Sequence, residues 1–327
     1  MLCRGSLNLI TDVPGLTVGH ADAVGSPTGV TTLLADGFWS AGVDVRGGGP
    51  GARELSALSP ENTVGRVHAI VLSGGSVFGL AAADGVTQAL SARDVGLRLA
   101  AGTPAIPIVP CAVLHDLDGV CPWSDEPPYR ALGMASVGNA NRRFALGSVG
   151  AGRGAKAGIR KGGIGSASLD LGDGIVVGAL VAANPVGSVV MPDDRTYWAW
   201  PYEIDKEFGG YRPGEMPPAI EPIPDQSRLA SLGRLQPGRN TTLAVVAASA
   251  TLSTAECHRL AIMAQDGLAR AIRPVHTPFD GDIVFALAKG VDLDQGLGDR
   301  GAQIARIGSA AADCLARAVA IAVHHAS

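Results

Sequence analysis

The uncharged segment TTLAVVAASA, residues 241–250, constrains the fold most, because it contains only aliphatic, β-branched and small residues. A short apolar run of this kind is typical of a buried strand. It directly follows a polar stretch rich in Pro and Gly, residues 200–240, which is predicted to be a loop. The sequence therefore predicts an abrupt change from loop to buried strand at Asn240-Thr241.

The composition predicts a large globular protein and excludes several classes. The 327 residues are 46% hydrophobic and 17% charged, which favours a well-buried core over disorder. A net charge of −4, with Lys and Arg scattered, gives no electrostatic reason to expect nucleic acid or an anionic membrane as partner. Five cysteines without a CxxC pair predict neither a disulfide framework nor a zinc site. Without a secretion-signal pattern or a sufficiently long apolar run, we expect a cytoplasmic protein that does not span a membrane.

Alternating apolar runs and Gly turns predict the other elements. Strands are expected in LTVGHAD, GVTTLLAD, AGVDVRGG and HAIVLSGG, and a helix is expected over residues 79–93. A hairpin about the Gly-Asp-Gly turn at 172–174 is expected, with a further strand after Asn184-Pro185. A helix capped by Ser253 and Glu256, a strand after 282 and a long C-terminal helix follow. This order predicts a layered α+β sandwich.

Two glycine motifs resemble known functional motifs, but the sequence around them does not support either function. Residues 150–155, GAGRGA, match a relaxed dinucleotide fingerprint but lack the required strand, turn and helix, so a Gly-rich turn is expected. Ser76 in GGSVFG lacks the second Gly of a nucleophile elbow, because Phe78 occupies that position. We expect Ser76 to be a helix N-cap instead.

The junction at Asn240-Thr241 offers a more specific chemistry. If this peptide bond breaks, Thr241 gains a free α-amine beside its hydroxyl, so that one residue carries both nucleophile and base. Asp280 and Asp282 flank a glycine at the entrance to an apolar strand, where buried carboxylates need partners. They are either the cap of a strand or acids that orient the catalytic hydroxyl and amine.

Three further residues have both a structural and a functional interpretation. Lys161 lies in a Gly-rich stretch and is either solvent-exposed or a cation that stabilises developing negative charge. Asn184 precedes a proline and is either a turn residue or an oxyanion donor. His276 lies in the loop that leads to Asp280, where a buried, hydrogen-bonded structural role is favoured over a general base.

Several long motifs in the same order resemble one family. ITDVPGLTVGH, LSGGSVFGLAAADGV, KGGIGSAS, NTTLAVVAASATLSTAE and DGLARAIRPVHTPFDGDIVFALA resemble the self-processing aminopeptidases, a family of L-aminopeptidase/D-amidase-esterases, β-peptidyl aminopeptidases and nylon-oligomer hydrolases. The resemblance implies a four-layer αββα sandwich, similar to N-terminal-nucleophile hydrolases but with different connectivity. It also implies a single domain, 1–327, cut into an α chain 1–240 and a β chain 241–327, which form a homotetramer of αβ units without cofactor or metal.

The resemblance also implies roles for individual residues. Thr241 would be the nucleophile, Asn184 the oxyanion donor and Lys161 a catalytic-site cation, with Asp280 and Asp282 as orienting acids. The substrate would be a short peptide, a β-peptide or an ω-amino-acid oligomer. The segment 112–130 lies where the resemblance is weakest and is expected to shape the pocket, and its acids Asp116, Asp118 and Asp125 are candidate partners for a substrate amine. An acyltransferase of the ornithine-acetyltransferase type and an uncleaved binding protein are the alternatives.

Overall fold

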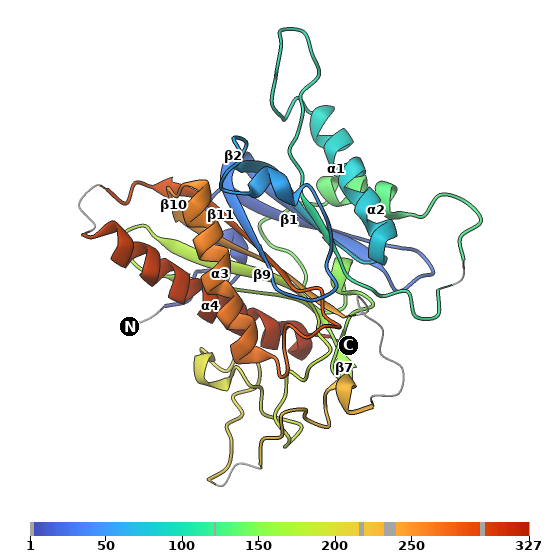
Figure 1. Ribbon diagram of the computed structural model, residues 1–327, viewed down its shortest axis with the longest axis vertical. Helices are drawn as coiled ribbons and strands as arrows, with labels where there is room; N and C mark the ends of the chain where they lie inside the picture. The colour runs from blue at the N-terminus through green and yellow to red at the C-terminus, as the bar shows by residue number, and fades with distance from the viewer. Residues whose placement is uncertain (1–2, 121, 216–218, 232–239, 295–297, 327) are drawn as a thin grey trace.

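The strands of the protein form a central array with a helix pair on either side (Figure 1). The computed structural model describes residues 3–120, 122–215, 219–231, 240–294 and 298–326. The strands are β1 Leu16–Asp22, β2 Gly29–Val45, β3 Gly51–Arg53, β4 Arg66–Ser73, β5 Cys111–Val113, β6 Lys156–Ala157, β7 Arg160–Lys161, β8 Gly163–Asp170, β9 Val176–Asn184, β10 Thr241–Ala250 and β11 Ile283–Val291. The α-helices are α1 Ala82–Ser91, α2 Tyr129–Gly138, α3 Thr254–Ala271 and α4 Arg300–His324.

Strand β2 lies in the middle of this array and pairs with β4 on one side and with β11 on the other. The hydrogen-bonded order is β3-β5-β4-β2-β11-β10-β9-β8, and β1 also pairs with β2. The register of β2 against β4 shifts between Leu34 and Trp39, where Gly37 has a φ of +95°. The sequence predicted two strands here, at 29–36 and 41–48. That prediction is wrong because a local irregularity at a glycine bends a strand without ending its pairing.

Alternate residues of β10 face two different cores. Ala244, Val246 and Ala248 pack in the core that contains α3 and α4. Leu243 and Val245 face the other way, into a core shared with β1, β2 and β4. On the far side of β4, a third core is formed with α1 and α2. The sheet sections and helix pairs therefore stack as the predicted four-layer αββα sandwich.

The C-terminal helix α4 is part of this core. By length and composition it is apolar enough to cross a membrane, although the sequence suggested only short apolar runs. However, 83% of its apolar window is buried, in contact with α3, β8 and β9. The approach to β8 is close, because a Cβ added at Gly165 would lie 1.9 Å from the carbonyl oxygen of Ala318. Packing within the fold thus accounts for the apolar surface of α4.

Several local predictions can be compared directly with the structure. The Ser253–Glu256 capping box and the hairpin β8–β9 are confirmed. Ser76 is not a cap: it is the first residue of a 3-10 helix, Ser76–Ala81, and has a φ of +52° after the capping Gly75. The strand expected after Pro185 is absent from the described residues around it, where isolated bridges replace a ladder. Residues 150–152 form one turn of 3-10 helix, in agreement with the rejection of a dinucleotide motif.

Candidate active site

Sheet register brings the Asn240-Thr241 junction against two other predicted site residues. In the antiparallel pair β9–β10, Asn184 lies directly opposite Thr241. On the other side, β11 runs parallel to β10, and the pairing extends backwards as a bridge between Asn240 and Asp280. Positions far apart in the sequence therefore meet at one end of the β9-β10-β11 section.

The peptide between Asn240 and Thr241 is buried. Thr241 is 2% exposed, and its Oγ1 donates a hydrogen bond to the carbonyl oxygen of Asn240 at 2.5 Å. The backbone N–H of Gly281 donates to the same oxygen at 2.8 Å. The hydroxyl that would attack this carbonyl is therefore already in contact with it.

The two carboxylates on either side of Gly281 bind backbone and loop groups. Asp280 accepts bonds from Val186 N at 3.0 Å and from the N–H and hydroxyl of Thr277 at 3.1 and 2.6 Å. Asp282 accepts from Thr242 N at 2.7 Å and from the N–H and Nδ1 of His276 at 3.1 and 2.8 Å. His276 is thus hydrogen-bonded, as predicted, but its side chain is 19% exposed rather than buried.

Burial sets the pKa of Asp280. Asp280 is 1% exposed and Asp282 is fully buried. Loss of hydration, together with the nearby charge of Asp282, raises the pKa of Asp280 above its usual range. The hydrogen bonds above are the partners that such burial requires, so in the uncut chain the acids hold the loop in place. Their predicted action on the hydroxyl and amine of Thr241 stays a prediction.

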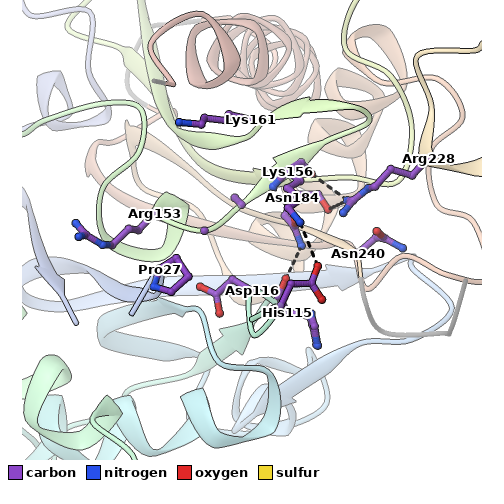
Figure 2. Close-up of a pocket in the computed structure, with 12 residues that line it drawn as sticks. Pro27, His115, Asp116, Arg153, Lys156, Lys161, Asn184, Arg228 and Asn240 are labelled. Atoms are coloured by element: carbon purple, nitrogen blue, oxygen red, sulfur yellow. Dashed lines mark hydrogen bonds and ion pairs between the residues drawn. The ribbon is translucent and has the colours of Figure 1, made fainter. Parts of the chain in front are cut away.

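A cavity of about 440 Å³ opens beside the junction (Figure 2). Among the residues that line it are five predicted site residues: Asp116, Asp118, Lys161, Asn184 and Asn240. Asp125 lies elsewhere, in a separate cavity of about 720 Å³ beside Trp123. The structure thus brings two of the three candidate acids to the junction and places the third apart from it.

The side chain of Asn184 is fixed in this cavity. Its Oδ1 accepts the backbone N–H of Lys156 at 2.9 Å, and its Nδ2 donates to the carbonyl oxygen of His115 at 3.2 Å. These contacts leave the second Nδ2 hydrogen for another acceptor.

Lys156 is a cavity residue that the sequence analysis missed. Its Nζ lies 3.1 Å from Asp118, and its backbone orients Asn184. Lys161 pairs with it across the β6–β7 hairpin, but in Figure 2 Lys161 lies apart from the group around Asn184. Two lysines in one Gly-rich stretch look alike in the sequence, and only the hairpin distinguishes them.

Asp116 is the buried acid of the cavity. It is 4% exposed and accepts a hydrogen bond from the N–H of Gly75 at 2.7 Å. Burial raises its pKa to about 6, against the opposite effect of this bond and of the hydroxyl of Thr28. Among the described residues, no group of three or more His, Cys, Asp or Glu side chains is arranged to hold a metal ion.

Comparisons with known proteins show which solved structures have a similar fold. The structure is similar to that of a β-aminopeptidase from Burkholderia sp., with a TM-score of 0.68 and 26% identity over 98% of this chain and 88% of that one. It also resembles the L-aminopeptidase D-Ala-esterase/amidase of Ochrobactrum anthropi, described as a variant of the Ntn hydrolase fold (TM-score 0.67, 19% identity, 99% and 88% coverage). The fold and site thus define an amide-bond hydrolase with an Ntn-type fold.

The sequence comparisons identify the family. Residues 8–327 match peptidase family S58, and the chain belongs to it. It is 44% identical to an uncharacterized aminopeptidase of Mycobacterium leprae over 99% of this chain and 92% of the relative. It is 31% identical to the 6-aminohexanoate-oligomer endohydrolase of Paenarthrobacter ureafaciens, over 84% of this chain and 73% of that enzyme.

Proposed function

We propose that this protein is a self-processing amide hydrolase that cuts its own Asn240–Thr241 bond and then uses the N-terminal Thr241 as nucleophile. One observation carries the proposal: the hydroxyl of Thr241 contacts the carbonyl of the residue before it. This contact lies at the first residue of a fully buried strand, beside the cavity. The products would be an α chain 1–240 and a β chain 241–327.

Self-cleavage explains how the buried threonine becomes a catalyst. Before cleavage its nitrogen is an amide, which cannot accept a proton. Afterwards it is an α-amine with an ordinary pKa of about 7.7–8, so a useful fraction is neutral near pH 7. The amine takes the proton from Oγ1 as the hydroxyl attacks a substrate amide, and returns it to the leaving nitrogen. Water then releases the acyl group from Thr241.

The cavity supplies groups for this reaction. The remaining Nδ2 hydrogen of Asn184, opposite Thr241, would donate to the substrate oxyanion. Lys156 adds positive charge on the same side, beside Asp118, and Lys161 adds it at the edge of the cavity. Asp280 and Asp282 would hold the start of β10 in position.

Two carboxylates of the cavity indicate the substrate class. Asp116 and Asp118 line the cavity that Asn240 also lines, and a carboxylate there attracts a protonated amine. Short amides with a free amino group on the acyl side fit this arrangement: peptides, β-peptides and ω-amino-acid oligomers. The names of the β-aminopeptidase and of the oligomer endohydrolase are consistent with that class. A homotetramer of αβ units, as the family resemblance implies, is part of the proposal, and so is a cytoplasmic location.

Substitution of the nucleophile tests the proposal. Thr241→Ala removes the attacking hydroxyl, so the chain should stay whole and inactive towards aminoacyl nitroanilides. Thr251→Ala is a matched control, because its exposed hydroxyl donates to the carbonyl oxygen of Gly290 near the end of β11. Mass spectrometry should find a fragment that begins at Thr241 in the wild type and in the control. Cleavage at the same bond in Thr241→Ala would refute the assignment.

A further inference from the structure

We propose that the backbone N–H of Gly281 is the oxyanion donor for self-cleavage, and that this role is separate from that of Asn184 towards substrate. The inference rests on the self-cleavage proposed above and names the group that would stabilise its transition state. It concerns a backbone group that no side-chain motif reveals.

The N–H of Gly281 contacts the carbonyl that Thr241 would attack. Gly281 N lies 2.8 Å from the carbonyl oxygen of Asn240, which is the oxygen that becomes negative when Thr241 attacks. A donor already in place at that oxygen stabilises the charge without reorganisation. In the same uncut chain, the side chain of Asn184 binds His115 and Lys156 instead.

Hydrogen bonds of the two flanking acids hold the N–H of Gly281 in position. The carboxylate before it, Asp280, binds Val186 N and Thr277, while the carboxylate after it, Asp282, binds Thr242 N. The two acids thus tie the loop around Gly281 to the segment that follows β9, through Val186, and to the start of β10, through Thr242. They are positioning residues for Gly281 in this step.

The space around Gly281 has no room for a side chain. A Cβ at this position would lie 2.7 Å from the carbonyl oxygen of Gly49 and 2.8 Å from Oγ1 of Thr241. Both distances are shorter than real Cβ contacts, so a side chain would displace either the loop or the nucleophile. Glycine therefore lets the loop approach the junction closely enough to donate.

The step is an N→O acyl shift. Oγ1 of Thr241 bonds to the carbonyl carbon of Asn240, and the oxygen of that carbonyl takes up the negative charge beside the N–H of Gly281. The C–N bond then breaks, and the proton lost by Oγ1 ends on the nitrogen of Thr241, which becomes an amine. Water hydrolyses the resulting ester to the carboxylate of Asn240 and the free hydroxyl of Thr241.

An amide-to-ester replacement removes this donor and keeps every side chain; it also weakens the carbonyl of Asp280, which accepts the N–H of Gly49 at 2.8 Å, as an acceptor. Cell-free translation of the full chain with glycolic acid at position 281 replaces the N–H by an oxygen. The same replacement at Gly301, an exposed residue in the first turn of α4, is the matched control. Loss of one oxyanion donor costs roughly 10²–10³ in rate. Self-cleavage at Asn240–Thr241 should therefore slow by that factor in the variant with the ester at position 281, while the control variant keeps the wild-type rate.

The outcomes separate this inference from the function on which it rests. If neither the wild type nor the control cuts, the self-cleaving function fails, and the inference fails with it. If both cut and the 281 ester keeps pace within about threefold, self-cleavage stands and the role of Gly281 is overturned.

A second measurement does not depend on the folding of the ester. In the uncut variant Thr241→Ala, residue-resolved hydrogen exchange should show the amide of Gly281 protected, because its acceptor on Asn240 is retained. In the cut wild-type protein, protection at Gly281 should fall as that carbonyl is released. An unprotected Gly281 amide in the uncut variant would overturn the proposal.

Discussion

The buried carboxyl of Asp116 leads to a pH dependence that can be calculated. If this group binds the ammonium of the substrate, it does so only when ionised, and burial raises its pKa to about 6. Because the pKa of an acid is raised, the attraction is present above pH 6 and is lost as the pH falls through 6. The ionised fraction is about 0.9 at pH 7 and about 0.1 at pH 5, so selectivity for an ammonium substrate should fall about tenfold.

The assay must cancel the titration of the α-amine of Thr241. We therefore compare kcat/KM for 6-aminohexanoyl nitroanilide with that for hexanoyl nitroanilide, which lacks the amine. The ammonium has a lysine-like pKa of about 10.4 and stays charged across the range. Both substrates use the same nucleophile, so their ratio from pH 5 to 8 reports only on recognition of the ammonium.

Variants assign the transition to one carboxyl. Asp116→Asn should lower the ratio at pH 7 and make it independent of pH. Asp125→Asn should keep the wild-type curve, because Asp125 lies in the separate cavity beside Trp123. A wild-type ratio that does not change between pH 5 and 8, or a transition that persists in Asp116→Asn, would refute the reasoning.

Three further predictions concern charge and packing. Lys156→Ala should reduce turnover more than Lys161→Ala in steady-state assays, because the ammonium of Lys156 lies 3.1 Å from Asp118 in the cavity; equal losses would contradict this. Arg317→Ala should lower the free energy of unfolding by about 3–5 kcal/mol in denaturant titrations, because it leaves a buried carboxylate without its charge partner. Gly165→Ala should destabilise by roughly 1–3 kcal/mol, since its Cβ would collide with α4. Gly138→Ala, which meets nothing within 4 Å, is the control and should be neutral or slightly stabilising.

Local sequence signals predicted much of the fold. The uncharged run after Asn240 forms a strand with all ten residues buried, and the capping box at Ser253 begins α3. These predictions succeeded because an uncharged apolar run and a capping box are patterns of residues close together in the sequence. The single strand β2 was not predicted, because a glycine in a run of strand residues has the same appearance at a bend and at a turn.

The site divides in the same way. Thr241, Asn184, Asp280 and Asp282 were predicted as site residues because each begins, ends or precedes an apolar strand, and polar residues at such positions need an explanation. Sequence alone could not find Lys156 or the N–H of Gly281. The first depends on the β6–β7 hairpin, and the second is a backbone group whose partner is set by its neighbours in space.

The sequence by itself thus determined most of the elements, the layered class and the hydroxyl of Thr241 placed where a strand begins. Tertiary structure alone decided what surrounds that hydroxyl. The register of β9 and β11 against β10 sets Asn184 opposite Thr241 and Gly281 on the carbonyl of Asn240. The physical reason is that strand periodicity is local, whereas register is fixed by packing both faces of the sheet at once.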